Sequence, residues 1–397
     1  MSPPSHSGPD GCPGMLRIHA AADGGLARVR LPGGLLRAPQ FAALADAAAD
    51  LGDGHLELTS RGNIQVRGLM DGAEAELGTR LRDVGLLPSA THERVRNIAA
   101  SALTGRDHEG LLDVRPLVAE LDAGLCADPA LAGLPGRFLF TLDDGRGDVI
   151  ALRGDVGLYP AGDGGLALVL GGADSGLRAD PRDAVALALD AARAFLRVRT
   201  TEWRLTEWPD AADRLAPLLG GHREPPLEIP ATPRRTPLGR LPQRDGRVAV
   251  SGLVPLGRLE PAQLTALRAA GEIIVTPWRT AVIPDLTDVS DSLLDRWGLV
   301  TAPASAWEGL TSCAGRPGCA RSRTDVRADA ARARAPGGGP PVHWSGCERR
   351  CGHPADRHVG VVATPQGYEV RLGDEVRARS HDLTATAAAV ATTRRSM

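Results

Sequence analysis

The chain has 397 residues, enough for two or three domains that each bury a core of their own. Its formal net charge of -2 excludes the basic excess that marks proteins binding nucleic acid. No apolar stretch is long enough to span a membrane, and the first residues lack the pattern of a signal peptide. We therefore expect a cytoplasmic protein whose cysteines are reduced or metal-bound, with no nucleic-acid or membrane partner.

The order of predicted elements divides the chain into six regions, set by changes in periodicity and by Pro- and Gly-rich breaks. These are a disordered polar leader (1–14), a strand–helix–strand–strand–helix unit (15–87), a mixed region of helices and short strands (88–219), a linker (220–245), a second copy of the first unit (246–302) and a cysteine-containing region (303–397).

A strand pair within residues 56–68 has one apolar and one polar face, because successive side chains of a strand point to opposite sides. Ile64 and Val66 are expected to point into the core. The other face collects four hydrogen-bonding side chains, Arg61, Asn63, Gln65 and Arg67. Such a wall suits an anionic or heteroatom-rich ligand, and a solvated strand face is the alternative interpretation.

The second unit repeats the first. Residues 254–267 echo residues 29–44, and residues 274–283 echo residues 58–66. An internal duplication explains both similarities. It predicts two half-sheets related by a pseudo-twofold axis, with room for a ligand between them.

Four of the six cysteines are Cys313, Cys319, Cys347 and Cys351, spaced Cys-x5-Cys and Cys-x3-Cys with 27 residues between the pairs. Four thiolates on two short, glycine-flanked loops are the ligand set of a cubane iron–sulfur cluster. Zinc is the rival metal, but its structural sites more often use knuckles of two to four intervening residues. The remaining cysteines, at positions 12 and 126, are expected to be incidental thiols.

Four segments together resemble the nitrite/sulfite reductase superfamily and, within it, the precorrin-3B synthases of the oxygen-dependent cobalamin pathway. They are Leu-Thr-Ser-Arg-Gly-Asn-Ile-Gln (58–65), Arg-Asn-Ile (96–98) with Asp-Val-Arg-Pro-Leu (113–117), Thr-Pro-Trp-Arg (276–279) and the four-cysteine signature. The resemblance implies an α+β fold, with duplicated ferredoxin-like half-domains and two mixed α/β reductase-type domains around a central tetrapyrrole pocket. The second mixed domain, residues 303–397, would carry a 4Fe–4S cluster on the four cysteines.

One departure distinguishes the subfamilies. Reductases carry two basic residues, one position apart, on the strand matched by residues 137–139, but the second position here is Leu139. An apolar side chain can neither neutralise an anion nor deliver a proton, so reduction of sulfite or nitrite is disfavoured. The resemblance then implies that arginines clamp the carboxylates of precorrin-3A, the candidates being Arg61, Arg96, Arg137 and Arg279.

The implied enzyme is an oxidoreductase, a monooxygenase that hydroxylates precorrin-3A at C20 and closes a γ-lactone, with O2 and an electron donor such as NADH. The family is also thought to involve a mononuclear non-haem iron, although no two-His-one-carboxylate triad stands out in the sequence. A monomer is expected. Two alternatives stay open: a sirohaem-dependent nitrite or sulfite reductase, and a metal-stabilised binding module without enzymatic activity.

Overall fold

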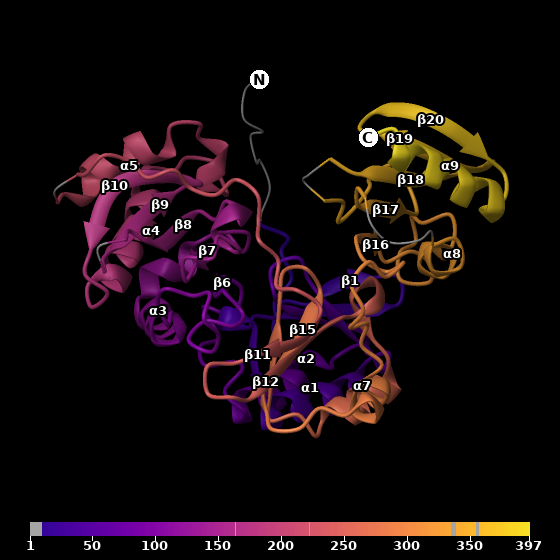
Figure 1. Ribbon diagram of the computed structural model, residues 1–397, viewed down its shortest axis with the longest axis horizontal. Coiled ribbons are helices and arrows are strands. Elements are labelled where there is room, and N and C mark those ends of the chain that lie inside the picture. Colours follow the sequence, from indigo (N-terminus) through magenta and orange to yellow (C-terminus); the bar gives the residue numbers. More distant parts are fainter. Residues whose placement is uncertain (1–9, 163, 222, 335–338, 355–356) are drawn as a thin grey trace.

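The computed structural model describes residues 10–397 apart from positions 163, 222, 335–338 and 355–356. Figure 1 shows a central body below two lobes, and the body contains both indigo and orange segments, which are far apart in sequence. The four sheets found among these residues have five strands each. Within the same part of the chain, no helix combines the length and the apolar character needed to cross a membrane.

The central body contains two copies of one arrangement of strands and helices. The first copy comprises β1 (His19–Ala21), β2 (Gly24–Val29), η1 (Pro32–Gly34), β3 (Leu35–Arg37), α1 (Ala38–Leu51), β4 (Leu56–Leu58), β5 (Ile64–Leu69) and α2 (Glu74–Asp83). The second copy comprises β11 (Gly239–Pro242), β12 (Val248–Leu253), η5 (Pro255–Gly257), β13 (Arg258–Leu259), α6 (Pro261–Leu267), β14 (Glu272–Val275), β15 (Thr280–Leu286) and α7 (Asp291–Trp297). The predicted duplication is thus visible as two matching sets of elements.

The two copies exchange one strand each. One sheet has the order β1-β2-β5-β4-β13 and the other β11-β12-β15-β14-β3. Strand β3 of the first copy pairs with β14 of the second, and β13 of the second copy pairs with β4 of the first. Because each copy completes the sheet of the other, the two halves of the sequence form one body.

Matching local chemistry starts the first helix of each copy. Helices α1 and α6 both have proline in the first turn, where its missing N–H is not needed. The third residue is glutamine in both, and its side-chain oxygen accepts a hydrogen bond from the N-cap amide. These bonds are 3.0 Å long in each helix, from Arg37 to Gln40 and from Glu260 to Gln263.

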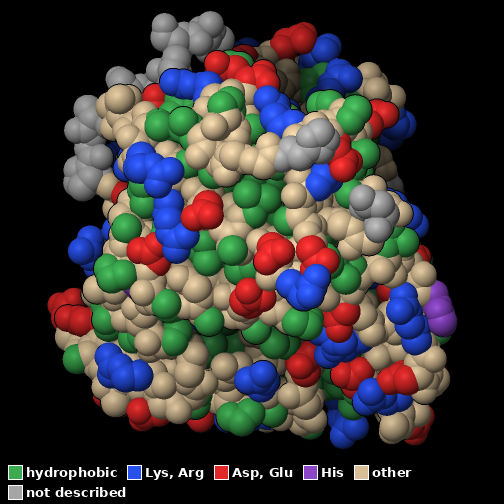
Figure 2. All heavy atoms as spheres, turned by 90° about the vertical axis from the view of Figure 1, so that its left-hand side faces the viewer, with side chains coloured by type: hydrophobic (Ala, Val, Ile, Leu, Met, Phe, Trp, Pro, Cys, Tyr) green, Lys and Arg blue, Asp and Glu red, His purple; other side chains and the backbone are tan. Residues whose placement is uncertain are grey.

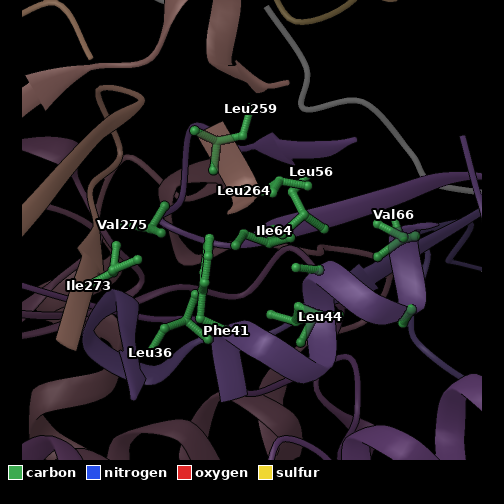
Figure 3. Close-up of a cluster of buried hydrophobic side chains, with 14 of the residues drawn as sticks. Leu36, Phe41, Leu44, Leu56, Ile64, Val66, Leu259, Leu264, Ile273 and Val275 are labelled. Carbon is green, nitrogen blue, oxygen red and sulfur yellow. The ribbon is translucent and has the colours of Figure 1, made fainter. Parts of the chain in front are cut away.

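The main hydrophobic core of the central body is shared by the two copies. Figure 3 shows side chains of both copies meeting there, for example Phe41 and Ile64 of the first and Leu264 and Val275 of the second. All four are at most 4% exposed. Full burial of such a side chain stabilises the fold by about 1.5–3 kcal/mol, so the shared core holds the two copies together.

The left-hand lobe of Figure 1 contains one mixed sheet, in the order β10-β9-β8-β7-β6, packed against helices. Its elements are β6 (Ile98–Ala100), α3 (Arg115–Ala127), η2 (Pro129–Gly133), β7 (Phe140–Leu142), η3 (Ile150–Leu152), β8 (Val156–Pro160), β9 (Leu166–Leu170), β10 (Ala173–Ala179), α4 (Ala184–Val198), η4 (Leu205–Glu207) and α5 (Ala211–Leu219). Figure 2 faces this side of the molecule and shows acidic and basic side chains interspersed, without a field of one sign.

The right-hand lobe contains the sheet β16-β17-β18-β19-β20. Its elements are β16 (Leu310–Ser312), α8 (Val326–Arg332), β17 (Val342–Ser345), β18 (Val359–Thr364), β19 (Gly367–Leu372), β20 (Glu375–Ser380) and α9 (Leu383–Arg395). Strands β16, β17 and β18 run parallel, so the segments that follow β16 and β17 leave the same edge of the sheet. The predicted α+β class is confirmed.

Two predicted boundaries differ from the structure. The range expected to be a linker, residues 220–245, contains β11, which pairs with β12 over four residues. The leader begins outside the described residues, but its last part is held in place. The amide of Gly136 donates to Asp10 Oδ2, and the amide of Arg28 donates to the carbonyl of Gly14 at 2.9 Å. Proline-rich composition predicted disorder and a linker here, but it carries no information on contacts with residues far away in the sequence.

Candidate functional site

A cavity of about 590 Å³ lies where the central body meets both lobes. Segments far apart in sequence supply its wall, with Arg61, Leu139, Arg235, Arg279 and His353 as representatives of five of them. Cavities that hold small ligands typically measure about 300–1,000 Å³. A small-molecule ligand here would touch both copies of the central body and both lobes.

Two equivalent turns bring an arginine each to the cavity wall. The turn at residues 59–63 links β4 to β5, and the turn at residues 276–280 links β14 to β15. In each, the amide of the first residue donates to the carbonyl of the fifth, at 2.9 and 3.0 Å, and the amide of the fourth donates to the carbonyl of the first, at 3.2 and 3.1 Å. The cavity arginine is the third residue of the first turn, Arg61, and the fourth residue of the second, Arg279.

These two arginines are half-buried, and the only carboxylates that act on them do so through space, Asp155 on Arg61 and Glu57 on Arg279, among the described residues. Burial, with a further contribution from nearby Arg204, lowers the pKa of Arg61 to about 10, and burial also lowers the pKa of Arg279. Arg61 therefore remains charged at neutral pH. Neither guanidinium has a hydrogen-bond or ion-pair partner among the described residues. A buried charge without a partner is costly, so the cavity is suited to an anionic ligand.

The described part of the cavity wall is strongly basic. It contains five arginines, Arg61, Arg153, Arg204, Arg235 and Arg279, and none of its described residues is a carboxylate. Among the residues that the structure describes, only Arg204 of these five has a carboxylate partner, with its Nε donating to Asp155 Oδ2 at 2.6 Å. The remaining four leave an excess of positive charge at the cavity.

Asp155 fixes part of the wall from behind. Its carboxylate is fully buried and also accepts the amides of Leu139, at 2.6 Å, and Leu205, at 2.7 Å. Burial raises the pKa of this carboxyl, and the charge of Arg204 opposes the shift. These bonds tie Arg204 and the backbone of residue 139 to one anchor, so both positions are rigidly placed.

An apolar surface lies beside the arginines. Leu139 is 4% exposed and forms a small cluster with Ala99 and Val149, against which Leu152 and Trp278 pack. Leu139 and Trp278 both line the cavity. The structure thus places the leucine that departs from the reductase pattern on the cavity wall, next to an indole ring that can contact a flat ligand.

Asn63 and Gln65, two of the predicted ligand contacts, are engaged within the protein. Asn63 Oδ1 accepts the amide of Leu31 at 2.9 Å, and its Nδ2 donates to Asn97 Oδ1 at 3.1 Å. Gln65 Oε1 accepts Arg28 Nε at 3.1 Å. Of the four side chains predicted to form the polar face, Arg61 thus lines the cavity whereas Asn63 and Gln65 do not, and ligand contact by these two residues stays a prediction.

Two arginines predicted to contact the ligand, one on the polar strand face and one among the clamps, have internal carboxylate partners. Arg67 donates to both oxygens of Asp23, at 3.1 and 3.0 Å, and to the carbonyl of Gly318 at 2.9 Å. Arg96 donates to both oxygens of Asp122, at 2.6 and 2.7 Å. Neither side chain lines the cavity. Their donors are used in holding elements together, with Arg67 linking the first sheet to the first cysteine loop.

Arg137 lies near the cavity but is exposed. Its guanidinium carbon sits 5.3 Å from the centre of the Trp203 ring, a cation–π contact. The predicted strand begins only at Phe140, so Arg137 lies in the turn before it, and it is not part of the cavity wall. Its predicted contact with a substrate carboxylate remains untested.

The four candidate cluster ligands lie on two neighbouring loops. Cys313 directly follows β16 and Cys347 follows β17 by one residue, so both leave the same edge of adjacent parallel strands. Cys319 and Cys351 lie further along the same loops. The two loops touch, because the amide of Arg323 donates to the carbonyl of Gly346 at 3.0 Å. All four cysteines are free thiols.

The backbone of the two loops is arranged to approach and hydrogen-bond to sulfur, whereas the cysteine side chains do not converge on one point. The amide of Gly346 donates to Cys313 Sγ at 3.2 Å, and a Cβ added at Gly346 would lie 1.8 Å from Ser322 Oγ. Burial raises the pKa of Cys313, and the Gly346 amide opposes that rise. However, no three His, Cys, Asp or Glu side chains among the described residues converge on a metal-binding point. The donor set fits a 4Fe–4S cluster, but neither the cluster nor the additional iron is assigned by this geometry.

Sequence reasoning missed three cavity arginines, Arg153, Arg204 and Arg235. All 46 basic residues are arginine, so residue type alone cannot select them. In the structure, Arg153 follows a short helical turn and has a left-handed backbone with φ 52°, but no motif in the sequence marks that conformation. Arg235 lies in the segment expected to be only a linker, and no periodic pattern marks it.

Comparison with known proteins supports this arrangement. Residues 19–83 match the family described as the nitrite/sulfite reductase ferredoxin-like half domain. The chain is 28% identical to a ferredoxin–nitrite reductase of Synechococcus elongatus, covering 90% of this chain and 81% of that protein. It is 27% identical to a precorrin-3B synthase of a Sinorhizobium species, with 90% and 81% covered.

The solved structure of the NirA protein of Mycobacterium tuberculosis shares the fold, with a TM-score of 0.68 over 89% of this chain and 75% of that one, at 22% identity. The relatives named as enzymes are oxidoreductases. Residues 19–83 of the central body thus match the nitrite/sulfite reductase ferredoxin-like half domain, and about 90% of the chain is similar in sequence both to a ferredoxin–nitrite reductase and to a precorrin-3B synthase.

Proposed function

We propose that this chain is a precorrin-3B synthase, a monooxygenase that binds precorrin-3A in the central cavity, hydroxylates it at C20 and closes a γ-lactone. The observation that carries the proposal is the wall at Leu139. An apolar, buried side chain stands where a reductase needs a base, between an indole ring and half-buried arginines without ion-pair partners among the described residues. A flat polycarboxylate ligand matches this combination, whereas a small inorganic anion does not.

Each part of the wall has a role in this proposal. Arg61 and Arg279 bind carboxylates of the macrocycle, since guanidinium pairs with carboxylate through two parallel hydrogen bonds. Leu139 and Trp278 contact its face. Asp155 keeps Arg204 and the backbone of Leu139 in place, so that the ligand is oriented by rigid groups.

The proposed reaction inserts one oxygen atom of O2 into precorrin-3A and reduces the other to water, which consumes two electrons and two protons. NADH or another donor supplies these electrons. A 4Fe–4S cluster, when bound at Cys313, Cys319, Cys347 and Cys351, supplies single-electron transfer. The arginines hold the substrate throughout, and the closely packed wall around Leu139 limits access of water to the oxidised carbon.

A sirohaem-dependent nitrite or sulfite reductase is the second candidate, because the nitrite reductase and the synthase are similar to this chain to nearly the same degree. Protein purified without oxygen separates the two. A broad brown absorbance without a Soret band fits the synthase. A Soret band together with viologen-dependent reduction of nitrite or sulfite would overturn the proposal.

The direct test is incubation of the purified protein with precorrin-3A, reductant and O2, followed by mass spectrometry. We expect a product heavier by one oxygen atom, absent when O2 is left out. The cluster is tested separately by Cys347→Ser, which should remove most bound iron and acid-labile sulfide because a hard hydroxyl replaces a soft thiolate. Cys126→Ser is the matched control and should retain both.

A further inference from the structure

The two equivalent turns of the cavity differ at one strained position. Their fourth residue has a left-handed backbone in both, with φ 67° at Gly62 and φ 60° at Arg279. Glycine adopts this conformation freely, whereas a residue with a Cβ does so at a cost in free energy. The turn of the first copy is therefore unstrained at this position, whereas the same turn in the second copy is strained because the residue is an arginine.

The residues around Arg279 leave space for its side chain but provide no hydrogen-bond acceptor for its guanidinium among the described residues. Gly257 lies against it, and a Cβ built on Gly257 would come within 2.5 Å of Arg279 Cδ. The guanidinium then lies in the cavity wall, half-buried and without a partner among the described residues. Backbone strain and the partial burial of this charge both raise the free energy of the ligand-free fold, and only the through-space attraction of Glu57 opposes the second effect.

We propose that Arg279 determines specificity at the expense of stability: its left-handed backbone directs a carboxylate-binding group to the cavity from the copy opposite Arg61. This inference rests on the proposed function, since it takes the occupant to be a flat polycarboxylate. The first turn offers its arginine from the third position, and the second offers an indole at the third and an arginine at the fourth. The asymmetry lets the two copies distinguish the two ends of a ligand.

The test compares three variants with wild type by thermal unfolding without ligand and by fluorescence titration with uroporphyrin III, a stable octacarboxylate macrocycle. Arg279→Gly removes both strain and charge, whereas Arg279→Ala removes the charge and keeps a Cβ at φ 60°. Ala304→Gly is the matched control, because Ala304 is exposed, has φ 58° and lies outside the cavity wall. It relieves similar strain away from the site.

We expect Arg279→Gly to unfold about 1–3 °C above wild type and above Arg279→Ala, and to bind uroporphyrin III at least about tenfold more weakly. Ala304→Gly should raise the unfolding temperature and leave binding unchanged. The inference is overturned if Arg279→Gly binds as tightly as wild type, or if it unfolds at or below the temperature of Arg279→Ala. Failure of wild type itself to bind the macrocycle would overturn the proposed function together with this inference.

Discussion

Two arginines outside the central cavity, Arg67 and Arg96, and two that line it, Arg61 and Arg279, differ in that only the first group forms ion pairs among the described residues. Arg67 and Arg96 each bind both oxygens of a carboxylate. Arg61 and Arg279 have no such partner among the described residues. In a chain with 46 basic residues, all of them arginine, the type of residue therefore says little. Whether an arginine forms an ion pair within the protein separates arginines that stabilise the fold from arginines that are available to a ligand.

The largest expected effect comes from breaking a paired arginine. Arg96→Ala leaves the Asp122 carboxylate and the Leu86 carbonyl without their donor, so we expect a loss of about 3–5 kcal/mol in the free energy of unfolding. Denaturant titration measures it. Arg80→Ala, which removes an exposed ion pair, should cost less than about 1 kcal/mol. Unchanged stability of Arg96→Ala together with weaker ligand binding would place Arg96 in the second group.

A lysine at position 139 would add another positive charge to the cavity wall, beside arginines that form no ion pair among the described residues. Leu139→Lys buries an ammonium near Arg61 and Arg204, so we expect the free energy of unfolding to fall by about 2–4 kcal/mol and turnover of precorrin-3A to weaken. Leu139→Met keeps the wall apolar at similar volume and should cost less than about 1.5 kcal/mol. A lysine variant with normal stability and increased nitrite reduction would argue for the reductase.

Removing an unpaired arginine should affect binding rather than folding. Arg61→Met deletes a charge-assisted contact with the ligand, worth about 1.5–3 kcal/mol, and so should raise the Kd for uroporphyrin III roughly tenfold or more. Its unfolding temperature should equal or exceed that of wild type, because no internal partner is lost. A clear drop in stability would show that Arg61 belongs with the structural arginines.

The smallest effect is expected at Arg137, which is exposed and stacks on Trp203. Arg137→Ala should lower stability by about 0.5–1 kcal/mol and chiefly raise KM, with kcat nearly unchanged. Steady-state kinetics at saturating O2 measures both constants. A fall in kcat without a change in KM would give Arg137 a role in the reaction itself.

Local patterns predicted the elements, the duplication and the shared position of the two cysteine pairs, because these depend on periodicity and on motifs within a few residues. The same patterns could not predict which arginines are free. Asp122 lies 26 residues from Arg96 and Asp23 lies 44 residues from Arg67. Arg235 reaches the cavity from a segment without regular structure. Pairing of this kind is decided by tertiary contacts that leave no mark on nearby sequence.

The strand exchange was also beyond sequence reasoning, because β3 and β13 have three and two residues and so carry almost no periodic signal. The sequence showed only that the two copies are similar to each other, not that they exchange strands. The exchange arises because each copy ends its own sheet early and leaves an edge for the short strand of the other.

That exchange also sets the order of events when the chain is made. The edge of β4 stays open until β13 has been synthesised about 200 residues later. At about 5–20 residues per second, this leaves an unpaired strand edge and half of a hydrophobic core without its complement for roughly 10–40 s. A nascent chain of this design depends on protection from neighbouring chains over that interval, and a truncation before residue 258 would make the exposure permanent.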